Sequence, residues 1–171
     1  MYDKETEKPY SIDYREKAPA KSHQDMYLYD DGSFNKEKLS TFGYLSSGVP
    51  GTVAGLWEGH QKFGSLPWED LLEDAIFYAE NGFYITPYME DILIRYNEKM
   101  SFFPETRNIF QADFPNFKNK KFFQKDLAKT LKIIAVEGKD GFYKGEIAEK
   151  IADDMKLNGG LISINDLNNY S

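Results

Sequence analysis

Apolar residues recur every three or four positions through most of the chain after residue 50, which is the spacing of amphipathic helices. Glycine, proline and capping residues divide this pattern into short segments. We therefore predict helices over residues 50–64, 67–82, 125–137 and 145–158, and another that starts at Thr86 as its N-cap. Five helices with little strand predict a mainly α fold that carries a short N-terminal β element.

The first 46 residues carry a different pattern. Tyr10, Ile12 and Tyr14 alternate with polar residues, and this period of two predicts a short half-buried strand. Residues 30–33 give a turn signal. The charged residues 36–38 are expected to form a solvated surface.

Two later stretches lack helical spacing. Residues 101–122 combine many phenylalanines with two prolines and several asparagines, and we predict a loop anchored by aromatic side chains. Residues 161–164 are expected to be extended, with a further turn of helix beginning at Asn165. Since no long Gly/Ser or Pro linker interrupts the chain, we expect a single domain over residues 1–171.

The chain has 171 residues, with 21 Lys and Arg against 28 Asp and Glu, a formal net charge of −7 and no cysteine. This acidic balance argues against nucleic acid as a partner, because nucleic-acid binders need clustered Lys and Arg. The lack of cysteine excludes disulfides, thiolate nucleophiles and Cys-ligated zinc. No apolar run approaches the roughly 20 residues that span a bilayer. Charged residues follow Met1 where a secretory signal would be apolar.

The two histidines, His23 and His60, offer little scope for metal or triad chemistry. They lie far apart in sequence, and neither belongs to an H-x-x-x-H or H-E-x-x-H motif. His60 lies on a predicted helix and is interpreted as a partly exposed packing residue. Ser22, His23 and Asp25 form a Ser-His-Asp set on paper, but sequence neighbours rarely reach the geometry of a triad. We expect no metal ion and no cofactor.

The glycine-rich residues 48–55 lead into a predicted helix, an arrangement that suits a phosphate-binding loop. The segment lacks the Gly-Lys-(Ser/Thr) ending and follows no convincing buried strand. We therefore favour a tight turn into a closely packed helix. The carboxylate pairs at 69–70 and 153–154 fall on predicted helix faces, where solvation is the default interpretation and acid/base catalysis would require burial.

Arg15 is the polar residue with the clearest binding chemistry. Its rigid fork of donors suits bidentate binding of a carboxylate, and its position where a predicted strand gives way to a loop allows it to face a cleft. An arginine flanked by Asp13, Glu16 and Lys17 is, however, usually part of a surface ion-pair set. The residues alone leave both interpretations open.

Several segments resemble motifs of the γ-glutamyltranspeptidases, also called glutathione hydrolases, in the order in which that family carries them. Residues 12–19 are similar to the family's D-(F/Y)-R-E-x-A-P, residues 24–28 to R-D-M-(F/Y)-L, and residues 48–55 to G-x-P-G-T-V-A-G. The remaining similarities are residues 62–67 with K-(Y/F)-G-(T/S)-(L/M)-P, 81–83 with x-G-F, 142–148 with F-Y-x-G-x-I-A, and 159–167 with G-G-L-I-x-x-x-D-L. One such match is weak, but the ordered series is highly specific.

The resemblance implies an N-terminal-nucleophile hydrolase with an αββα fold. In that family a precursor cleaves itself, and the new N-terminal threonine of the small subunit attacks a γ-glutamyl amide with its own α-amine as general base. The implied substrates are γ-glutamyl compounds such as glutathione, and the acceptors are water, amino acids or peptides. The implied protein partner is the small subunit, and Arg15 would hold the α-carboxylate of the γ-glutamyl group. The family suggests a periplasmic or extracellular location.

The family's nucleophile motif T-T-H-(F/Y) and its upstream D-G-G-N-A-x-D-A-A segment are not found in these residues. The positions that bind the glutamyl amino group and the oxyanion in the family are missing as well. We therefore assign no catalytic residue, since no threonine here, Thr52 included, matches the nucleophile. The chain is interpreted as a single partial domain, an internal piece of a large subunit that is inactive alone. The alternative function is a non-enzymatic helical module that keeps the scaffold and binds a partner.

Overall fold

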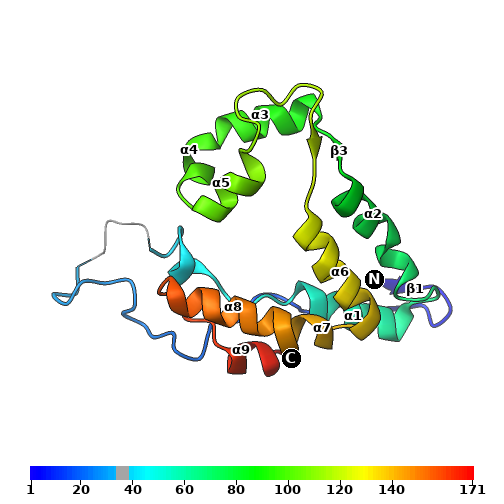
Figure 1. Ribbon diagram of the computed structural model, residues 1–171. Coiled ribbons are helices and arrows are strands. Elements are labelled where there is room, and N and C mark those ends of the chain that lie inside the picture. The colour runs from blue at the N-terminus through cyan, green and yellow to red at the C-terminus, as the bar shows by residue number, and fades with distance from the viewer. Residues whose placement is uncertain (34–38) are drawn as a thin grey trace. The chain divides into compact units, whose positions relative to one another are not determined.

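The computed structural model describes residues 1–33 and 39–171, and Figure 1 shows its elements. It contains 50% helix and 7% strand, which confirms the predicted mainly α fold class. The backbone divides into two compact units: Met1–Trp68 with Ile133–Ser171 form the first, and Glu69–Lys132 the second. The single partial domain expected from the sequence stays a prediction. Among the described residues, no helix combines the length and the apolar character needed to cross a bilayer.

The first unit contains the N-terminal hairpin and the helices around the main core. Its elements are β1 (Tyr2–Asp3), β2 (Lys8–Pro9), the 3-10 helix η1 (Tyr44–Ser46), α1 (Thr52–Phe63), the end of α6 (Lys125–Glu137), α7 (Asp140–Tyr143), α8 (Gly145–Leu157) and α9 (Ile164–Asn168). Helices α1, α6 and α8 confirm the predicted helices over 50–64, 125–137 and 145–158. The short α7 is an addition to the predicted set.

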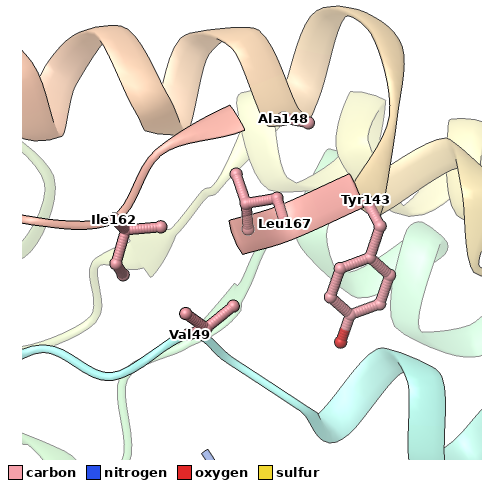
Figure 2. Close-up of a cluster of buried hydrophobic side chains, with 5 residues drawn as sticks. All are labelled: Val49, Tyr143, Ala148, Ile162 and Leu167. Atoms are coloured by element: carbon pink, nitrogen blue, oxygen red, sulfur yellow. The ribbon is translucent and has the colours of Figure 1, made fainter. Parts of the chain in front are cut away.

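A cluster of buried side chains, none more than 4% exposed, holds the first unit together (Figure 2). Val49 precedes α1, Tyr143 ends α7, Ala148 lies on α8, Ile162 precedes α9, and Leu167 lies on α9. Burying a large apolar side chain contributes about 1.5–3 kcal/mol. The cluster therefore ties the start of α1 to the three helical segments at the C-terminal end of the chain.

Helix α9 begins with a capping box that also reaches the N-terminal segment. Asp166 donates its backbone N–H to Ser163 Oγ at 3.3 Å, and Asp166 Oδ2 accepts from Ser163 N at 2.8 Å and from Ser163 Oγ at 2.6 Å. Asp166 Oδ1 accepts from the Ala20 amide at 2.8 Å. Burial raises the pKa of Asp166, but these hydrogen bonds and the charge of Lys21 outweigh it, so the pKa lies below its ordinary value.

Replacing Asp166 by alanine is expected to lower the free energy of unfolding by about 1–2 kcal/mol, because both the cap and the bond to Ala20 are lost. The folded-state pKa is depressed, so this stabilisation is present above the ordinary value of 3.8 and disappears as the pH falls through the lowered pKa. Urea unfolding of both proteins at neutral and acidic pH measures the difference. Asp153→Ala, on the exposed side of α8, is the control and should show no such loss.

The structure corrects the predicted strand at Tyr10–Tyr14. Residues 10–16, all of them described, form no strand; instead β1 pairs antiparallel with β2, with Tyr2 opposite Pro9. The segment lies on α1, because glycines at every fourth position leave one face of that helix flat. A Cβ on Gly55 would lie 2.1 Å from Tyr14 Cγ, and one on Gly59 would lie 3.4 Å from Ile12 Cδ1. The alternation of apolar residues thus reflects packing on a helix.

Three smaller predictions have different outcomes. The turn at 30–33 is confirmed, since Tyr29 N donates to Ser33 O at 2.9 Å and Gly32 N donates to Tyr29 O at 2.8 Å. The solvated surface expected at 36–38 lies outside the described residues. The extended stretch expected at 161–164 is one residue too long, because the Ser163 cap makes Ile164 the first residue of α9.

The second unit consists of short helices and one small sheet. Its elements are the 3-10 helix η2 (Asp70–Leu72), α2 (Glu73–Asn81), β3 (Phe83–Tyr84), α3 (Pro87–Arg95), α4 (Asn97–Ser101), α5 (Pro104–Phe110), β4 (Lys121–Phe122) and the start of α6. Thr86 caps α3 as predicted, accepting from Met89 N at 3.2 Å. The helix predicted from Pro67 begins only at Asp70. Trp68, which precedes it, is held in the first unit by a 2.9 Å bond from Nε1 to Ile134 O.

The loop predicted over 101–122 is only partly correct, because the stretch contains α5 and β4. Pro104 starts α5, a position where its missing N–H has no helical partner to lose. The aromatic anchoring is seen at Phe117, which is 1% exposed, although Phe102 lies at the surface. Gln111 Nε2 donates to Leu93 O at 2.9 Å, which links the end of α5 to α3.

Candidate substrate-binding groove at Arg15

Arg15 lies on the rim of a groove of about 710 Å³ in the first unit. One wall is formed by residues 12–16, and the other by Ser46, Gly48 and residues 50–52 at the start of α1. The two walls meet at a single antiparallel bridge, in which Lys17 N donates to Val49 O at 3.2 Å and Val49 N donates to Lys17 O at 2.8 Å. The sequence thus places the arginine where an extended segment passes the N-terminal end of a helix.

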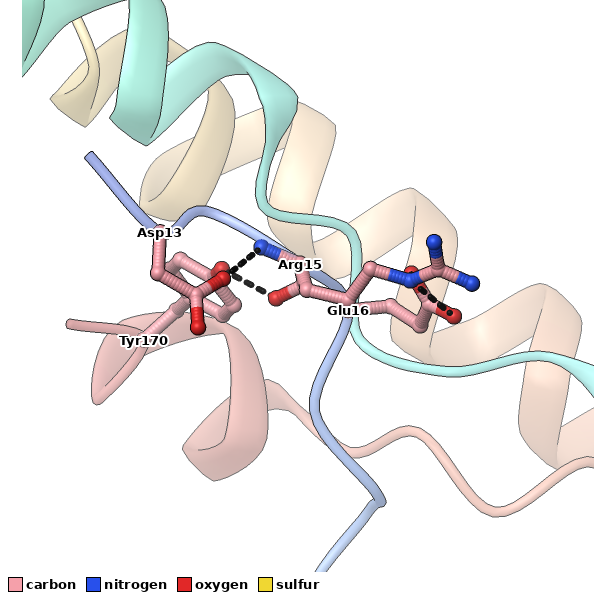
Figure 3. Close-up of polar contacts among 4 residues, drawn as sticks. All are labelled: Asp13, Arg15, Glu16 and Tyr170. Atoms are coloured by element: carbon pink, nitrogen blue, oxygen red, sulfur yellow. Dashed lines mark hydrogen bonds and ion pairs between the residues drawn. The ribbon is translucent and has the colours of Figure 1, made fainter. Parts of the chain in front are cut away.

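Two side chains form hydrogen bonds with the backbone of Arg15, one with its amide and one with its carbonyl (Figure 3). Its amide donates to Asp13 Oδ1 at 3.0 Å, and its carbonyl accepts from the Tyr170 hydroxyl at 2.6 Å. The Arg15 side chain extends away from these contacts and is 81% exposed. Its guanidinium is therefore accessible to a solute that enters the groove.

The expected ion-pair set around Arg15 is reduced to one pair. Arg15 Nε contacts Glu16 Oε2 at 3.0 Å and Oε1 at 3.2 Å. Asp13 uses its carboxylate on the Arg15 amide, and the Lys17 ammonium donates to the carbonyl of Ser171 and lies over the Tyr170 ring at 5.3 Å. Among the described residues, the hydrogen bond and the ion pair of the guanidinium both join its Nε to Glu16.

The Glu16 carboxylate is a weak partner for Arg15. Its own backbone N–H, followed by the Arg15 guanidinium, holds the pKa of Glu16 below its ordinary value, so the pair persists at neutral pH and is lost in acid. Both side chains are more than half exposed, and exposed pairs contribute little because water and salt screen them. The pair with Glu16 therefore leaves the Arg15 guanidinium exposed and only weakly held.

Glycines allow the two walls of the groove to approach. A Cβ on Gly48 would lie 2.8 Å from Glu16 Cγ, and one on Gly51 would lie 1.9 Å from the Tyr170 hydroxyl and 2.2 Å from Tyr14 O. The glycine-rich segment at 48–55 is therefore a tight entry into a closely packed helix, as the sequence favoured. Its glycines allow the start of α1 to lie in close contact with residues 14–16 and with Tyr170.

Two tyrosines that the sequence did not single out support this groove. Tyr143 is 4% exposed; its hydroxyl donates to Pro50 O at 2.6 Å and accepts from Ala54 N at 3.3 Å, and burial raises its pKa. Tyr143 stacks on Tyr170 with ring centroids 5.4 Å apart and an interplanar angle of 12°. Tyr143 lies in the F-Y-x-G segment. Tyr170 contacts Arg15 across 155 positions of sequence, so the local pattern gives no signal for this contact.

The other candidates from the sequence lack the geometry of an active site. Among the described residues, no hydrogen bond joins the side chains of Ser22, His23 and Asp25, and no cluster of three His, Asp or Glu could hold a metal ion. His60 packs at 5.2 Å from Trp68, with Nε2 at 2.8 Å from Leu66 O, which agrees with a packing role. The carboxylates at 69–70 and 153–154 are exposed, as expected for solvated pairs.

Comparison with known proteins identifies the family. The family model described as "Gamma-glutamyltranspeptidase" matches residues 1–171, and the chain belongs to this family. A glutathione hydrolase proenzyme from Pseudomonas aeruginosa is 44% identical over 168 residues, which cover 95% of this chain and 28% of that protein. The chain therefore spans little more than a quarter of that relative's length. The counterpart from Escherichia coli is 41% identical, with the same 28% covered.

Solved structures of the family share the fold of this chain. The γ-glutamyltranspeptidase of Helicobacter pylori matches with a TM-score of 0.88 and 40% identity, covering 93% of this chain and 46% of that one. The enzyme from Pseudomonas nitroreducens, solved in complex with L-DON, matches with a TM-score of 0.85 and 42% identity, covering 100% of this chain and 49% of that one. The mostly helical fold thus matches known γ-glutamyltranspeptidase structures.

Proposed function

We propose that this chain is part of the large subunit of a γ-glutamyltranspeptidase and that Arg15 binds the α-carboxylate of the γ-glutamyl substrate. The exposed guanidinium in the groove carries the proposal, because it lies in the D-Y-R-E segment and its ion pair, within the part of the chain that the structure describes, is the weak exposed one with Glu16. Its planar fork offers two parallel N–H donors to a carboxylate, a geometry that fixes orientation as well as charge.

The proposed reaction cleaves γ-glutamyl amides such as glutathione. A threonine outside this chain attacks the γ-carbonyl and expels the amine, and water, an amino acid or a peptide then takes the glutamyl group from the acyl-enzyme. This chain contributes binding and orientation: anchoring the α-carboxylate places the scissile amide against the nucleophile. The small subunit of the same precursor is its proposed partner.

The reading frame that contains this chain tests the proposal against the alternative of a non-enzymatic helical module. A downstream T-T-H-(F/Y) sequence, self-cleavage before its threonine, and turnover of a chromogenic γ-glutamyl amide support the enzyme. A complete protein without that threonine and without turnover supports the module.

The isolated 171-residue chain is expected to have no measurable γ-glutamyl hydrolase activity. These 171 residues carry no match to the family's threonine nucleophile, and removing a nucleophile typically costs several orders of magnitude in rate. Release of the chromophore from a γ-glutamyl amide by the purified chain is compared with a buffer blank and with the complete enzyme. Turnover above the blank would contradict the assignment of the nucleophile to another segment.

A further inference from the structure

The direction of the Arg15 side chain depends on how its backbone is held, because the segment that carries it pairs with no strand among the residues that the structure describes. Residues 10–16 form no strand, and the nearest ladder contact is the bridge at Lys17. The side chain itself is fixed only weakly, through an exposed contact with Glu16. The two bonds to the Arg15 amide and carbonyl are therefore direct constraints on the backbone from which the guanidinium projects.

Of the two residues that bond to the Arg15 backbone, Tyr170 is the one distant in sequence. Its hydroxyl donates to Arg15 O at 2.6 Å, whereas Asp13, which accepts from the Arg15 amide, is only two residues away in the same segment. Figure 3 shows both contacts reaching the Arg15 backbone while the guanidinium extends to the opposite side. The hydroxyl connects this segment to the residues that follow α9, and a local turn cannot supply that connection.

The Tyr170 ring is itself held in place. It stacks on the buried Tyr143, whose hydroxyl is bonded to Pro50 and Ala54 at the start of α1. The absence of a side chain at Gly51 leaves space for the Tyr170 hydroxyl, which a Cβ there would approach to 1.9 Å. Burial, followed by the negative charges of Asp13 and Glu16, raises the pKa of Tyr170, so the hydroxyl keeps the proton that it donates.

We propose that Tyr170 is a positioning residue for substrate recognition, whose hydroxyl fixes the Arg15 backbone so that the guanidinium meets the substrate α-carboxylate in a bidentate geometry. The inference rests on the proposed function of Arg15. It assigns Tyr170 no contact with the substrate. A displacement of the guanidinium by a fraction of an ångström weakens two directional bonds together, so loss of one remote hydroxyl reaches the binding step.

The test compares Tyr170→Phe with the parent in the complete enzyme, since this change removes one oxygen and keeps the ring stack on Tyr143. For a γ-glutamyl amide, KM is expected to rise about three- to tenfold with a smaller change in kcat. The corresponding 4-aminobutyryl amide, which lacks the α-carboxylate, should lose much less in kcat/KM. Tyr88 is an exposed tyrosine on α3, and Tyr88→Phe is the matched control. It should leave KM and kcat unchanged for both amides.

A double-mutant cycle shows whether Tyr170 acts through Arg15. In an Arg15→Ala background, Tyr170→Phe should have almost no further effect on KM, because the group that it positions is gone. An undiminished effect in that background, an equal loss on both amides, an unchanged KM, or a failure to fold or self-process would overturn the proposal. If Arg15→Ala alone leaves the preference for the α-carboxylate unchanged, the proposed function of Arg15 is wrong. If Arg15→Ala raises KM but Tyr170→Phe leaves KM unchanged, only the positioning role of Tyr170 is wrong.

Discussion

Arg15→Ala in the complete enzyme is expected to reduce kcat/KM for γ-glutamyl amides by roughly 30- to 1,000-fold. Two charge-assisted bonds to a carboxylate are worth about 2–4 kcal/mol in the complete enzyme, where we expect bound substrate and the small subunit to shield a guanidinium that is 81% exposed in this chain. The loss should appear mainly as a higher KM. Some loss in kcat should accompany it, since anchoring the α-carboxylate also orients the scissile amide.

Arg15→Lys should recover only part of this loss. Lysine keeps the charge but presents a compact ammonium in place of the planar fork that binds both carboxylate oxygens. Self-cleavage of the precursor should be largely spared in both variants, because it involves no free glutamyl substrate. Steady-state kinetics with subunit processing followed on a gel separates these effects.

Arg95→Ala is the matched control for Arg15. Arg95 is also exposed and paired with a neighbouring carboxylate, Asp91, through a 2.5 Å contact on α3. Its removal should leave KM unchanged. If the two Arg15 variants keep the parent KM and process normally, Arg15 is a surface ion-pair residue and its binding role is wrong.

Local chemistry explains which parts of the fold were predictable. The spacing of apolar residues located α1, α6 and α8, and Thr86 located the start of α3, because helix periodicity and caps are properties of adjacent residues. Alternation at Tyr10, Ile12 and Tyr14 failed as a strand signal. A flat glycine face on a helix accepts every second residue of an extended segment just as a sheet does.

The same distinction applies to the site. The proposed role of Arg15 comes from its donor geometry and from the motif around it, and the pair with Glu16 is a contact between sequence neighbours. The bond from Tyr170 was not predictable, since it joins residues 155 positions apart through the packing of α9, Tyr143 and α1. Local sequence therefore supplies the group proposed to meet the substrate and carries no signal for the residue proposed to position it.

Gly55→Ala tests the packing on which this groove depends. The new Cβ would lie 2.1 Å from Tyr14 Cγ and 2.2 Å from Tyr14 Cβ, atoms too close to the backbone to move away by side-chain rotation alone. The whole 12–16 segment must shift, so we expect a loss of about 2–3 kcal/mol in the free energy of unfolding. This loss should occur although alanine favours a helix over glycine by about 1 kcal/mol.

Gly59→Ala separates the clash from helix propensity, because Gly59 lies one turn further along α1. Its Cβ would contact Ile12 Cδ1 at 3.4 Å, an ordinary van der Waals distance, so this variant should be neutral or more stable by up to about 1 kcal/mol. Urea unfolding followed by circular dichroism compares the two. In the complete enzyme, Gly55→Ala should also raise KM, since Tyr14 precedes Arg15, whereas Gly59→Ala should not. Equal stability and equal KM in the two variants would show that residues 12–16 do not pack on α1. The assignment of these residues to one wall of the groove would then be wrong.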